Sequence, residues 1–347
     1  MDTRYSDEQL ALRSATAALL ADLGPRTVAD LDDTTRQARL AKAADSAGWF
    51  DLRGPGEDDG PLATGVEVAI VARELGRAAA DTPFLGPVVA ADLARQAGAD
   101  LDARVTSIVL DGALLDLAVR APSGEMDGVA VDCAGCERGL LVGAAEPGST
   151  ASVLDVPLPA PAPAPATDLT RAVAPLHVDA GARDVRVGPA VAEDMVARTR
   201  ALALAITVAD LVGIMEGTLE TTRTYAQERE QYGVAIGSFQ AVQHLLAEAR
   251  VLVEGAVSVA QYAAWAVDAL PPDDAWDAGA TAKAYCARAA RAVCETAIQV
   301  HGGIGNTWEC FVHVHLRRAL LSSALLGDEG HHLRGLARRR LGYDHGL

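Results

Sequence analysis

The sequence predicts a mainly α-helical protein with a central β domain, and two contrasts along the chain lead to this fold class. Apolar residues recur at helical spacing in the first hundred residues and in the C-terminal half, whereas short β-branched runs separated by turn residues fill the stretch between them. Half of the 347 residues are apolar but only 4% are aromatic, so alanine and valine must fill the interior. We expect an N-terminal helical domain at 1–102, a small, truncated, barrel-like β domain at 103–189 and a C-terminal four-helix bundle at 190–347.

The N-terminal domain is predicted from two helical stretches with a loop rich in glycine and acidic residues between them. Ser6 is suited to cap the first helix, and Asp7 and Glu8 follow in its first turn, where acidic side chains favour the helix dipole. The second helix lies within residues 66–83 and is ended by Gly76 and then by a proline.

Six short β-branched runs between residues 104 and 188 predict an antiparallel sheet or a small barrel. Cys133 and Cys136 form a single CAGC between two of these runs. A redox or zinc role would need a thioredoxin-like context or a second ligand pair, so we expect a turn. The proline–alanine stretch at 157–166 cannot join a sheet ladder, and we interpret it as an extended connector rather than a ligand for a proline-binding module.

Four long helices joined by short loops predict an up-and-down bundle in the last part of the chain. The first can run as one helix of about eleven turns over 191–230. The second begins near Phe239 and is broken by LPPDD at 270–274. The third spans about 275–300 and the fourth about 306–326, before a short basic helix.

Charge and composition exclude several classes of protein. The formal net charge of −17 argues against nucleic-acid binding, which normally uses a basic face. We find no apolar run typical of a membrane-spanning helix and no signal-peptide pattern at the N-terminus. The five cysteines do not suggest a disulfide scaffold. We therefore expect a cytoplasmic protein with reduced thiols and no metal site, which binds neither nucleic acid nor membranes.

The first candidate functional stretch is YAQEREQYGVAIGSFQAVQHLLAEA at 225–249. Arg229 is expected at the tip of a hairpin between two bundle helices, where a guanidinium can fork onto phosphate oxygens. Tyr232 offers a flat ring with a polar tip, and Gln240 lies in the first turn of the next helix, whose free N–H groups suit an anion. Taken alone, the stretch is also explained by an exposed hairpin with an ordinary surface arginine.

The second candidate stretch is QVHGGIG at 299–305, near the end of a helical run. Gln299 precedes a bend at Gly302, Gly303 and Gly305, although glycine inside a helix costs about 1 kcal/mol relative to alanine. The stretch is not a dinucleotide fingerprint, because no strand precedes it and the GxGxxG spacing is absent. Taken alone, it is explained by a helix–helix turn in which glycines permit close packing.

Together the two stretches resemble the acyl-CoA dehydrogenase family. The bundle of that family carries an R-x-x-[FY]-G hairpin followed by a glutamine, similar to the stretch from Arg229 to Gln240. It also carries a Q-x-x-G-G-x-G turn followed by an acidic residue, similar to the stretch from Gln299 to Glu309. Three further stretches extend the likeness, which is strong in the last third and loose in the middle: HLRRA at 315–319, GWF at 48–50 and ELGRAAADTPFLGP at 74–87.

This resemblance implies an FAD that lies across a subunit interface. In the family, the hairpin and the glycine turn of one subunit contact the diphosphate and adenosine of a flavin held mainly by its neighbour. Glycines let backbone amides approach the cofactor with no Cβ in the way. Eight residues are the implied FAD contacts in trans: Arg229, Tyr232, Gln240, Gln299, Val300, His301, Gly302 and Gly303.

The resemblance also implies a carboxylate base that takes the α-proton of an acyl-CoA while the β-hydride passes to the flavin. The family places this base 24 residues after the first glycine of the pair, which is Leu326 here, or about 26 residues before the hairpin arginine, which is Ala203. Neither residue is acidic, so we assign no catalytic residue to this chain. The loop and strand that wall the flavin ring in the family's β domain are also missing from 100–190.

The pattern of kept and lost motifs resembles the shorter subunit of heteromeric α2β2 acyl-CoA dehydrogenases. A related partner subunit would supply the base for α,β-dehydrogenation of an acyl-CoA, such as a bulky, steroid-side-chain-like thioester, with electron-transfer flavoprotein as the acceptor. A non-enzymatic scaffold or acyl-CoA-binding regulatory subunit is a second interpretation, against which the kept arginine and glycines argue. A self-sufficient homomeric enzyme is a third, with its base among five acidic residues: Glu193, Asp194, Glu216, Asp328 and Glu329.

Overall fold

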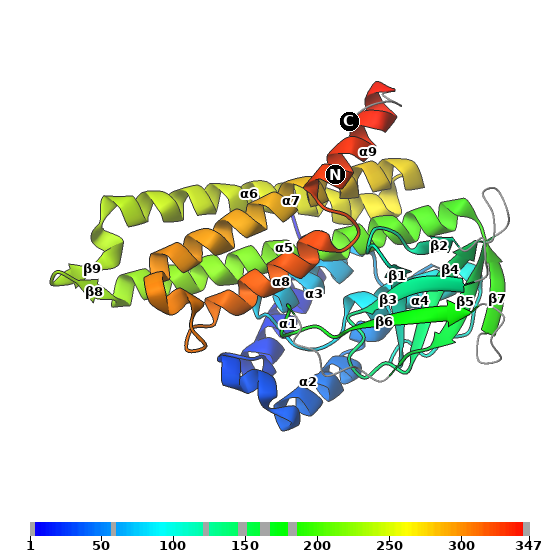
Figure 1. The fold of residues 1–347 in the computed structure, drawn as a ribbon, viewed down its shortest axis with the longest axis horizontal. Helices are drawn as coiled ribbons and strands as arrows, with labels where there is room; N and C mark the ends of the chain where they lie inside the picture. Colours follow the sequence, from blue (N-terminus) through cyan, green and yellow to red (C-terminus); the bar gives the residue numbers. More distant parts are fainter. Residues whose placement is uncertain are drawn as a thin grey trace.

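The N-terminal domain of the computed structural model, which describes residues 4–56, 60–120, 125–144, 151–159, 167–179 and 186–342, is helical. Ser6 caps the first helix as expected, and its side chain and that of Gln9 form a reciprocal capping box. The described elements of this domain are α1 (Asp7–Leu23), η1 (Val28–Asp32), α2 (Thr34–Ser46), η2 (Trp49–Asp51), α3 (Gly65–Arg77) and α4 (Leu85–Ala97). Figure 1 shows them in blue and cyan on one side of the bundle.

The middle domain is a seven-stranded sheet. Its strands are β1 (Thr106–Asp111), β2 (Ala118–Arg120), β3 (Glu125–Val131), β4 (Arg138–Ala144), β5 (Ala151–Pro157), β6 (Val173–Asp179) and β7 (Arg186–Val191). They lie in the order β6-β3-β1-β4-β5-β7, with β2 also paired to β4. The inward faces pack a small core of their own around residues such as Val109, Leu141 and Val156.

The prediction of an antiparallel sheet is wrong for two strand pairs, because β4 runs parallel to both β1 and β2. The reason is the path of the chain between β3 and β4. Cys133–Cys136 forms the expected turn, after which the backbone N–H groups of Glu137 and Arg138 both donate to the carbonyl of Val105 at the start of β1. The chain therefore enters β4 beside the beginning of β1 and runs in the same direction.

The two cysteines of the CAGC turn are unreactive thiols by environment. Burial raises the pKa of Cys133 to about 11 and that of Cys136 to about 12. A thiol needs a lowered pKa to act as a nucleophile at neutral pH, so the turn offers no redox chemistry. The proline–alanine stretch at 160–166 lies outside the described residues.

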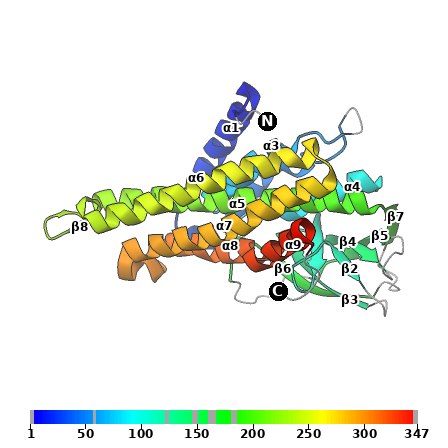
Figure 2. The ribbon, with the colours of Figure 1, turned by 90° about the horizontal axis from the view of Figure 1, so that it is seen from above.

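The C-terminal part is a bundle of α5 (Glu193–Glu228), α6 (Gln240–Ala269), α7 (Pro272–His301) and α8 (Val312–Ala324), followed by α9 (Glu329–Leu341). The mainly helical fold with a central β domain is thereby confirmed. The fourth helix begins later than predicted because the short helix η4 (Gly302–Asn306) and a turn precede it. Figure 2 shows α5, α6 and α7 side by side along the long axis, with the β8 hairpin at their far end.

Helix α5 forms the centre of the bundle. It is long and apolar enough to cross a membrane by length and composition, contrary to our expectation that no stretch would be. Since 89% of its most apolar window is buried among the other elements, its composition is explained by a core position.

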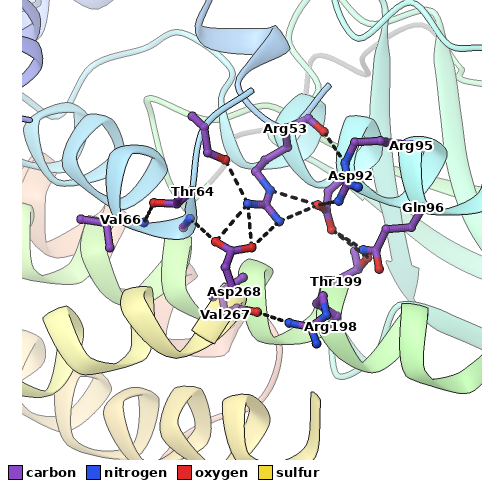
Figure 3. Close-up of polar contacts among 12 residues, drawn as sticks. Arg53, Thr64, Val66, Asp92, Arg95, Gln96, Arg198, Thr199, Val267 and Asp268 are labelled. Atoms are coloured by element: carbon purple, nitrogen blue, oxygen red, sulfur yellow. Dashed lines mark hydrogen bonds and ion pairs between the residues drawn. The ribbon is translucent and has the colours of Figure 1, made fainter. Parts of the chain in front are cut away.

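A buried ion-pair network fastens the N-terminal domain to the bundle (Figure 3). The guanidinium of Arg53, which is fully buried, lies 3.0 Å from a carboxylate oxygen of Asp92 on α4 and 3.1 Å from Asp268 on α6. Asp268 also accepts from the N–H of Gly65, at the start of α3, at 2.6 Å. Burial alone would lower the pKa of Arg53, but the two carboxylates raise it, so the arginine stays charged.

Candidate functional site at the end of the bundle

The first candidate stretch forms a tight hairpin beyond the end of α5. Strands β8 (Glu230–Gln231) and β9 (Val234–Ala235) pair antiparallel and leave a two-residue turn of Tyr232 and Gly233. Both turn residues have positive φ, +55° and +78°, as a type I′ turn requires. Positive φ is uncommon for a bulky residue, and the ring of Tyr232 is 88% exposed. No packing inside the described chain therefore accounts for a tyrosine at this tip.

Arg229 and Gln240 flank the hairpin. Arg229 is the C-cap of α5 and Gln240 is the first residue of α6, and both are exposed. Within the described residues, no hydrogen bond or ion pair holds either side chain. The N-terminus of α6 also has no side-chain cap, so its first N–H groups point outward beside the hairpin.

The glycines of the second stretch have three different environments. Gly302 ends α7 with φ +65° and ψ −142°, a conformation that favours glycine. A Cβ on Gly305 would lie 2.9 Å from the carbonyl oxygen of Ile298, so close packing excludes a side chain there. A Cβ on Gly303 would meet nothing within 4 Å, and its φ is not in the left-handed region. Neither its conformation nor packing against the described residues requires a glycine at position 303.

The structure brings the two stretches together, because α5 ends and α7 ends at the same end of the bundle (Figure 1). Tyr225 in the last turn of α5 stacks on the ring of His301, with ring centroids 4.2 Å apart and planes 17° from parallel. His301 Nδ1 also lies 2.9 Å from the carbonyl oxygen of Ala297. Sequence analysis did not single out Tyr225, since nothing local shows which helix ends will meet.

The eight predicted contact residues therefore fall into two groups. Val300 and His301 are buried, and the side chain of His301 is already engaged, so either could reach an external ligand only through its backbone. The remaining six are exposed: Arg229, Tyr232, Gln240, Gln299, Gly302 and Gly303.

Trp308 is an exposed residue of this end that sequence analysis missed. Its side chain is 63% exposed, with the guanidinium carbon of Arg317 5.5 Å from the ring centroid. Its neighbour in sequence, Glu309, belongs to the quoted motif, and an exposed tryptophan beside a motif is the signal that could have identified it. Other large apolar side chains exposed at this end are Val234, Phe239 and Ile304.

Both positions where a catalytic acid was sought are apolar and buried. Ala203 is 2% exposed on α5, and Leu326 is 5% exposed in the turn between α8 and α9. Leu326 has φ +61° and donates its N–H to the carbonyl of Leu114 at 2.7 Å, so its backbone is held against the β domain. Both side chains are uncharged and pack into the main hydrophobic core, so neither position offers a base.

The other candidate acids are engaged elsewhere or lie at the surface. Glu216 forms a two-pronged ion pair with Arg73, at 2.6 and 2.8 Å. Asp328 caps α9 and accepts from the N–H of His331 at 2.7 Å, which lowers the pKa of this carboxyl. A carboxylate with a lowered pKa is a weaker base, so capping explains Asp328 better than catalysis. Glu193 and Asp194 are exposed in the first turn of α5, and Glu329 is half-buried in the first turn of α9.

A buried charge cluster occupies the junction of the β domain with the bundle. Asp210 on α5 lies 2.8 Å from both Arg171 and Arg318. Burial would raise the pKa of Asp210, but the two guanidinium groups more than offset burial and lower it. The hydroxyl of Ser322 donates to the same carboxylate at 2.8 Å.

A helical domain, a β domain and a helical bundle, with an exposed arginine hairpin and glycine turn, form the architecture that is expected of a member of the acyl-CoA dehydrogenase family. Comparisons with known proteins are more specific. Residues 188–341 match the acyl-CoA dehydrogenase C-terminal domain. The chain is 31% identical to the acyl-CoA dehydrogenase IpdE2 of Mycobacterium tuberculosis over 335 residues, which cover 95% of this chain and 96% of the relative. The chain belongs to the acyl-CoA dehydrogenase family.

One further relative and two solved structures are also similar to this chain. The chain is 40% identical to the acyl-CoA dehydrogenase FadE34 of M. tuberculosis over 154 residues, but these are only 22% of that longer protein. Among solved structures, it is similar to a chain of the ChsE4–ChsE5 complex of M. tuberculosis, with TM-score 0.79, 25% identity and full coverage of both chains. It also shares its fold with a chain of a Tcur3481–Tcur3483 steroid ACAD variant, with TM-score 0.75, 20% identity and coverage of 95% and 97%.

Proposed function

We propose that this chain is the base-lacking but required subunit of a heteromeric, FAD-dependent acyl-CoA dehydrogenase. The observation that carries the proposal is Gly303, which nothing inside the chain requires to be glycine although it lies in the exposed turn. A neighbour that approaches the backbone closely explains such a position. Tyr232 supports the same conclusion, because its positive φ and exposure serve no contact within the described chain.

The end of the bundle fits the diphosphate and adenosine half of FAD. Arg229 would meet the phosphates as a charged fork, and the first N–H groups of α6 and the backbone of the glycine turn would add neutral donors. Gln240 and Gln299 would add side-chain amides, while Val300 and His301 would contribute only backbone. The bound flavin would accept the hydride, and the residues of this chain would orient the cofactor rather than react.

A related subunit would supply the base and the walls of the flavin ring. Leu326 and Ala203 give this chain no acid at either family position, and the Asp210 cluster holds the junction between sheet and bundle with fixed ion pairs. The ChsE4–ChsE5 complex is a pair of chains, and the Tcur3481–Tcur3483 pair is a steroid ACAD. By analogy we propose an α2β2 assembly, a bulky steroid-like acyl-CoA as substrate and electron-transfer flavoprotein as acceptor.

Co-expression with a related acyl-CoA dehydrogenase subunit from the same genome tests this function. The isolated chain should bind little FAD and show no dehydrogenase activity, whereas the co-purified complex should be yellow, with about one FAD per heterodimer. Absorbance at the flavin band and ferrocenium-linked turnover of an acyl-CoA measure both properties. A yellow, active homodimer of this chain alone would overturn the proposal.

Arg229→Ala in the complex tests the assignment of the site. Loss of one charge-assisted hydrogen bond costs about 1.5–3 kcal/mol, so FAD affinity should fall roughly 10- to 150-fold. Arg39→Ala on α2 removes an exposed arginine far from the bundle end and should leave FAD binding unchanged. If Arg229→Ala retains full FAD content and activity, the scaffold interpretation is favoured instead.

A further inference from the structure

Two hollows lie in line between four helices on one side of α5. The first is a cavity of about 220 Å³ lined by the beginning of α1 together with α3, α5 and α6. Small apolar side chains and Trp265 form much of its wall, and polar residues complete it. The apolar residues are Val66, Ala69, Ala209, Val212, Val257, Ala260 and Ala264, and the polar ones are Arg4, Tyr5, Ser6, Gln9, Arg73 and Gln261. An engineered apolar cavity of about 150 Å³ stays dry and binds benzene, so a cavity of this size can take a compact apolar group.

The second hollow, of about 520 Å³, is lined by one arginine from each of the same four helices. These are Arg13 on α1, Arg77 on α3, Arg223 on α5 and Arg250 on α6. Two glutamates, Glu216 and Glu220, also line it, so arginines outnumber acids in a chain of net charge −17. The four arginines are far apart in the sequence, so the fold brings their guanidinium groups to this hollow.

The charges of the second hollow are only partly neutralised. Arg77 pairs with Glu220, and Arg13 lies 2.8 Å from Glu74. Arg250 pairs with Glu254 one turn further along α6, where both side chains are more than half exposed. The contact of Arg223 within the described residues is a 3.4 Å hydrogen bond to the amide of Gln227, which carries no charge. Three of the four arginines are thus paired with carboxylates, and only Arg223 has no charged partner among the described residues. An anion entering the hollow could be met by Arg223 and by the N–H groups that the other three guanidinium groups do not use in their ion pairs.

An ion pair links the linings of the two hollows. Arg73 lines the apolar cavity and Glu216 lines the arginine hollow, and their side chains are joined at 2.6 and 2.8 Å. From Ala209 in the first hollow to Arg223 in the second, α5 advances fourteen residues, or about 21 Å. The two hollows, which we together call the groove, therefore follow one another along the same four helices, with an apolar end and a basic end.

We propose that this groove binds an amphipathic anion that has a compact apolar body and a phosphate-bearing head. The apolar body fills the cavity beside Trp265, and the head lies on the arginines beyond the Arg73–Glu216 pair. Phosphate is favoured over a single carboxylate because several guanidinium groups from different directions match its multiple oxygens and charges. CoA thioesters belong to this chemical class.

The groove is separate from the position at which the family's base was sought on α5. Ala209 and Val212 follow Ala203 by six and nine residues, which turns them about 240° and 180° around the helix. They therefore face away from the side of α5 that presents Ala203. The groove proposal does not rest on the proposed function, since it needs neither FAD nor a partner subunit.

Isothermal titration of the isolated chain with three probes tests the proposal. Octanoyl-CoA carries both parts of the ligand, CoA only the head and octanoate only the tail. Octanoyl-CoA should bind one site at least tenfold more tightly than either part alone. Equal affinity for CoA and octanoyl-CoA would show that the apolar cavity is not used, and absence of octanoyl-CoA binding would overturn the proposal.

Two groove variants and a matched control locate the site. Arg223→Glu combined with Arg250→Glu should weaken octanoyl-CoA at least tenfold, and Ala69→Leu, at a half-buried wall position, should do the same by filling the cavity. Arg39→Glu on α2, where the side chain is 64% exposed outside the groove, should have no effect. If both groove variants still bind octanoyl-CoA with unchanged affinity, the ligand binds elsewhere and the proposal is wrong.

The heteromeric complex separates this inference from the proposed function. Octanoyl-CoA should saturate one more site per heterodimer in the unmodified complex than in the groove variants, while FAD content and turnover stay the same. An inactive complex that keeps the additional site would contradict the proposed function alone. If the complex is active and the groove variants bind as many octanoyl-CoA molecules per heterodimer as the unmodified complex, only the groove proposal is contradicted.

Discussion

At the residue scale, the glycine turn shows how a single motif can combine three separate causes. Gly302 is required by backbone conformation, Gly305 by packing against Ile298, and Gly303 by neither. Sequence analysis treated the three as one feature, because spacing alone carries no information about which Cβ positions are open. Only coordinates separate a glycine that serves the fold from one that serves a contact outside the chain.

Gly303→Ala and Gly305→Ala form a matched pair that tests this distinction. Alanine at 303 meets no atom within 4 Å, so the free energy of unfolding should stay the same or rise by up to about 1 kcal/mol. FAD affinity of the heteromeric complex should nevertheless fall, since the new methyl group lies where the cofactor would approach. Chemical denaturation and flavin titration measure the two effects.

Gly305→Ala should give the opposite result. Its Cβ would lie 2.9 Å from a backbone carbonyl oxygen, an overpacking that typically costs about 1–3 kcal/mol of stability. Any loss of FAD should then follow the loss of folded protein. If Gly303→Ala destabilises as much as Gly305→Ala, or binds FAD normally, the assigned role of Gly303 is wrong.

At the scale of elements, helices were predictable where long runs ended in strong breakers. The helix predicted over 191–230 is observed as Glu193–Glu228, and LPPDD separates α6 from α7 as expected. The parallel pairing of β4 was not predictable, because neighbouring strands in a sheet need not be neighbours in sequence. The fourth helix began late for a similar reason: η4 continues a helical pattern in a different geometry.

The turn between α8 and α9 is held by a buried lysine that sequence patterns did not identify. Lys283 on α7 is fully buried, and its ammonium donates to the carbonyls of Ser323, Leu325 and Gly327 at 2.7–3.0 Å. The carbonyls of Ser323 and Leu325 lie at the C-terminal end of α8, where a helix offers them no N–H partner, and that of Gly327 lies in the following turn. The lysine therefore fixes the backbone around Leu326, the position at which a base was sought.

Lys283→Met should destabilise the fold strongly. Methionine keeps the apolar stem but leaves three buried carbonyls without a donor, at about 1–3 kcal/mol each, so the free energy of unfolding should fall by more than about 3 kcal/mol. Arg288→Met on the same helix, where the side chain is 78% exposed, should change it by less than about 1 kcal/mol. Urea denaturation at neutral pH compares the stabilities of the two variants. Equal losses of stability would contradict the role of Lys283 in holding the turn between α8 and α9.

At the scale of the whole molecule, the domains are joined by buried charge rather than by apolar contact alone. Arg53 links the loop after η2 to α4 and α6, and Asp210 links α5 to the β domain through Arg171. Such pairs need complete satisfaction, since a partnerless buried charge is costly. Arg53→Ala should therefore destabilise by about 3–5 kcal/mol.

Arg104→Ala is the control for Arg53→Ala, because Arg104 forms ion pairs with Asp45 and Asp51 while half exposed. Exposed ion pairs contribute about 0–1 kcal/mol to stability, so the free energy of unfolding of Arg104→Ala should be close to that of the unmodified protein. Two separate thermal transitions in Arg53→Ala, rather than one lower transition, would show that the network joins domains that can fold apart. A midpoint unchanged from the unmodified protein would contradict the network's role.

The assembly itself leads to the last prediction. Trp308 and the exposed apolar side chains Val234, Phe239 and Ile304 lie at the end of the bundle that also carries the proposed FAD contacts. Tryptophan is enriched among residues that dominate the free energy of association, and their truncation typically costs about 2 kcal/mol or more. Trp308→Glu should therefore weaken the heteromeric complex at least about thirtyfold in sedimentation experiments while leaving the isolated chain folded.

Leu62→Glu is the control, because it introduces the same charge at a side chain of similar exposure, 61% against 63%, in the N-terminal domain. If Leu62→Glu dissociates the complex and Trp308→Glu does not, the partner docks on the N-terminal domain, and the end of the bundle is not the shared cofactor site.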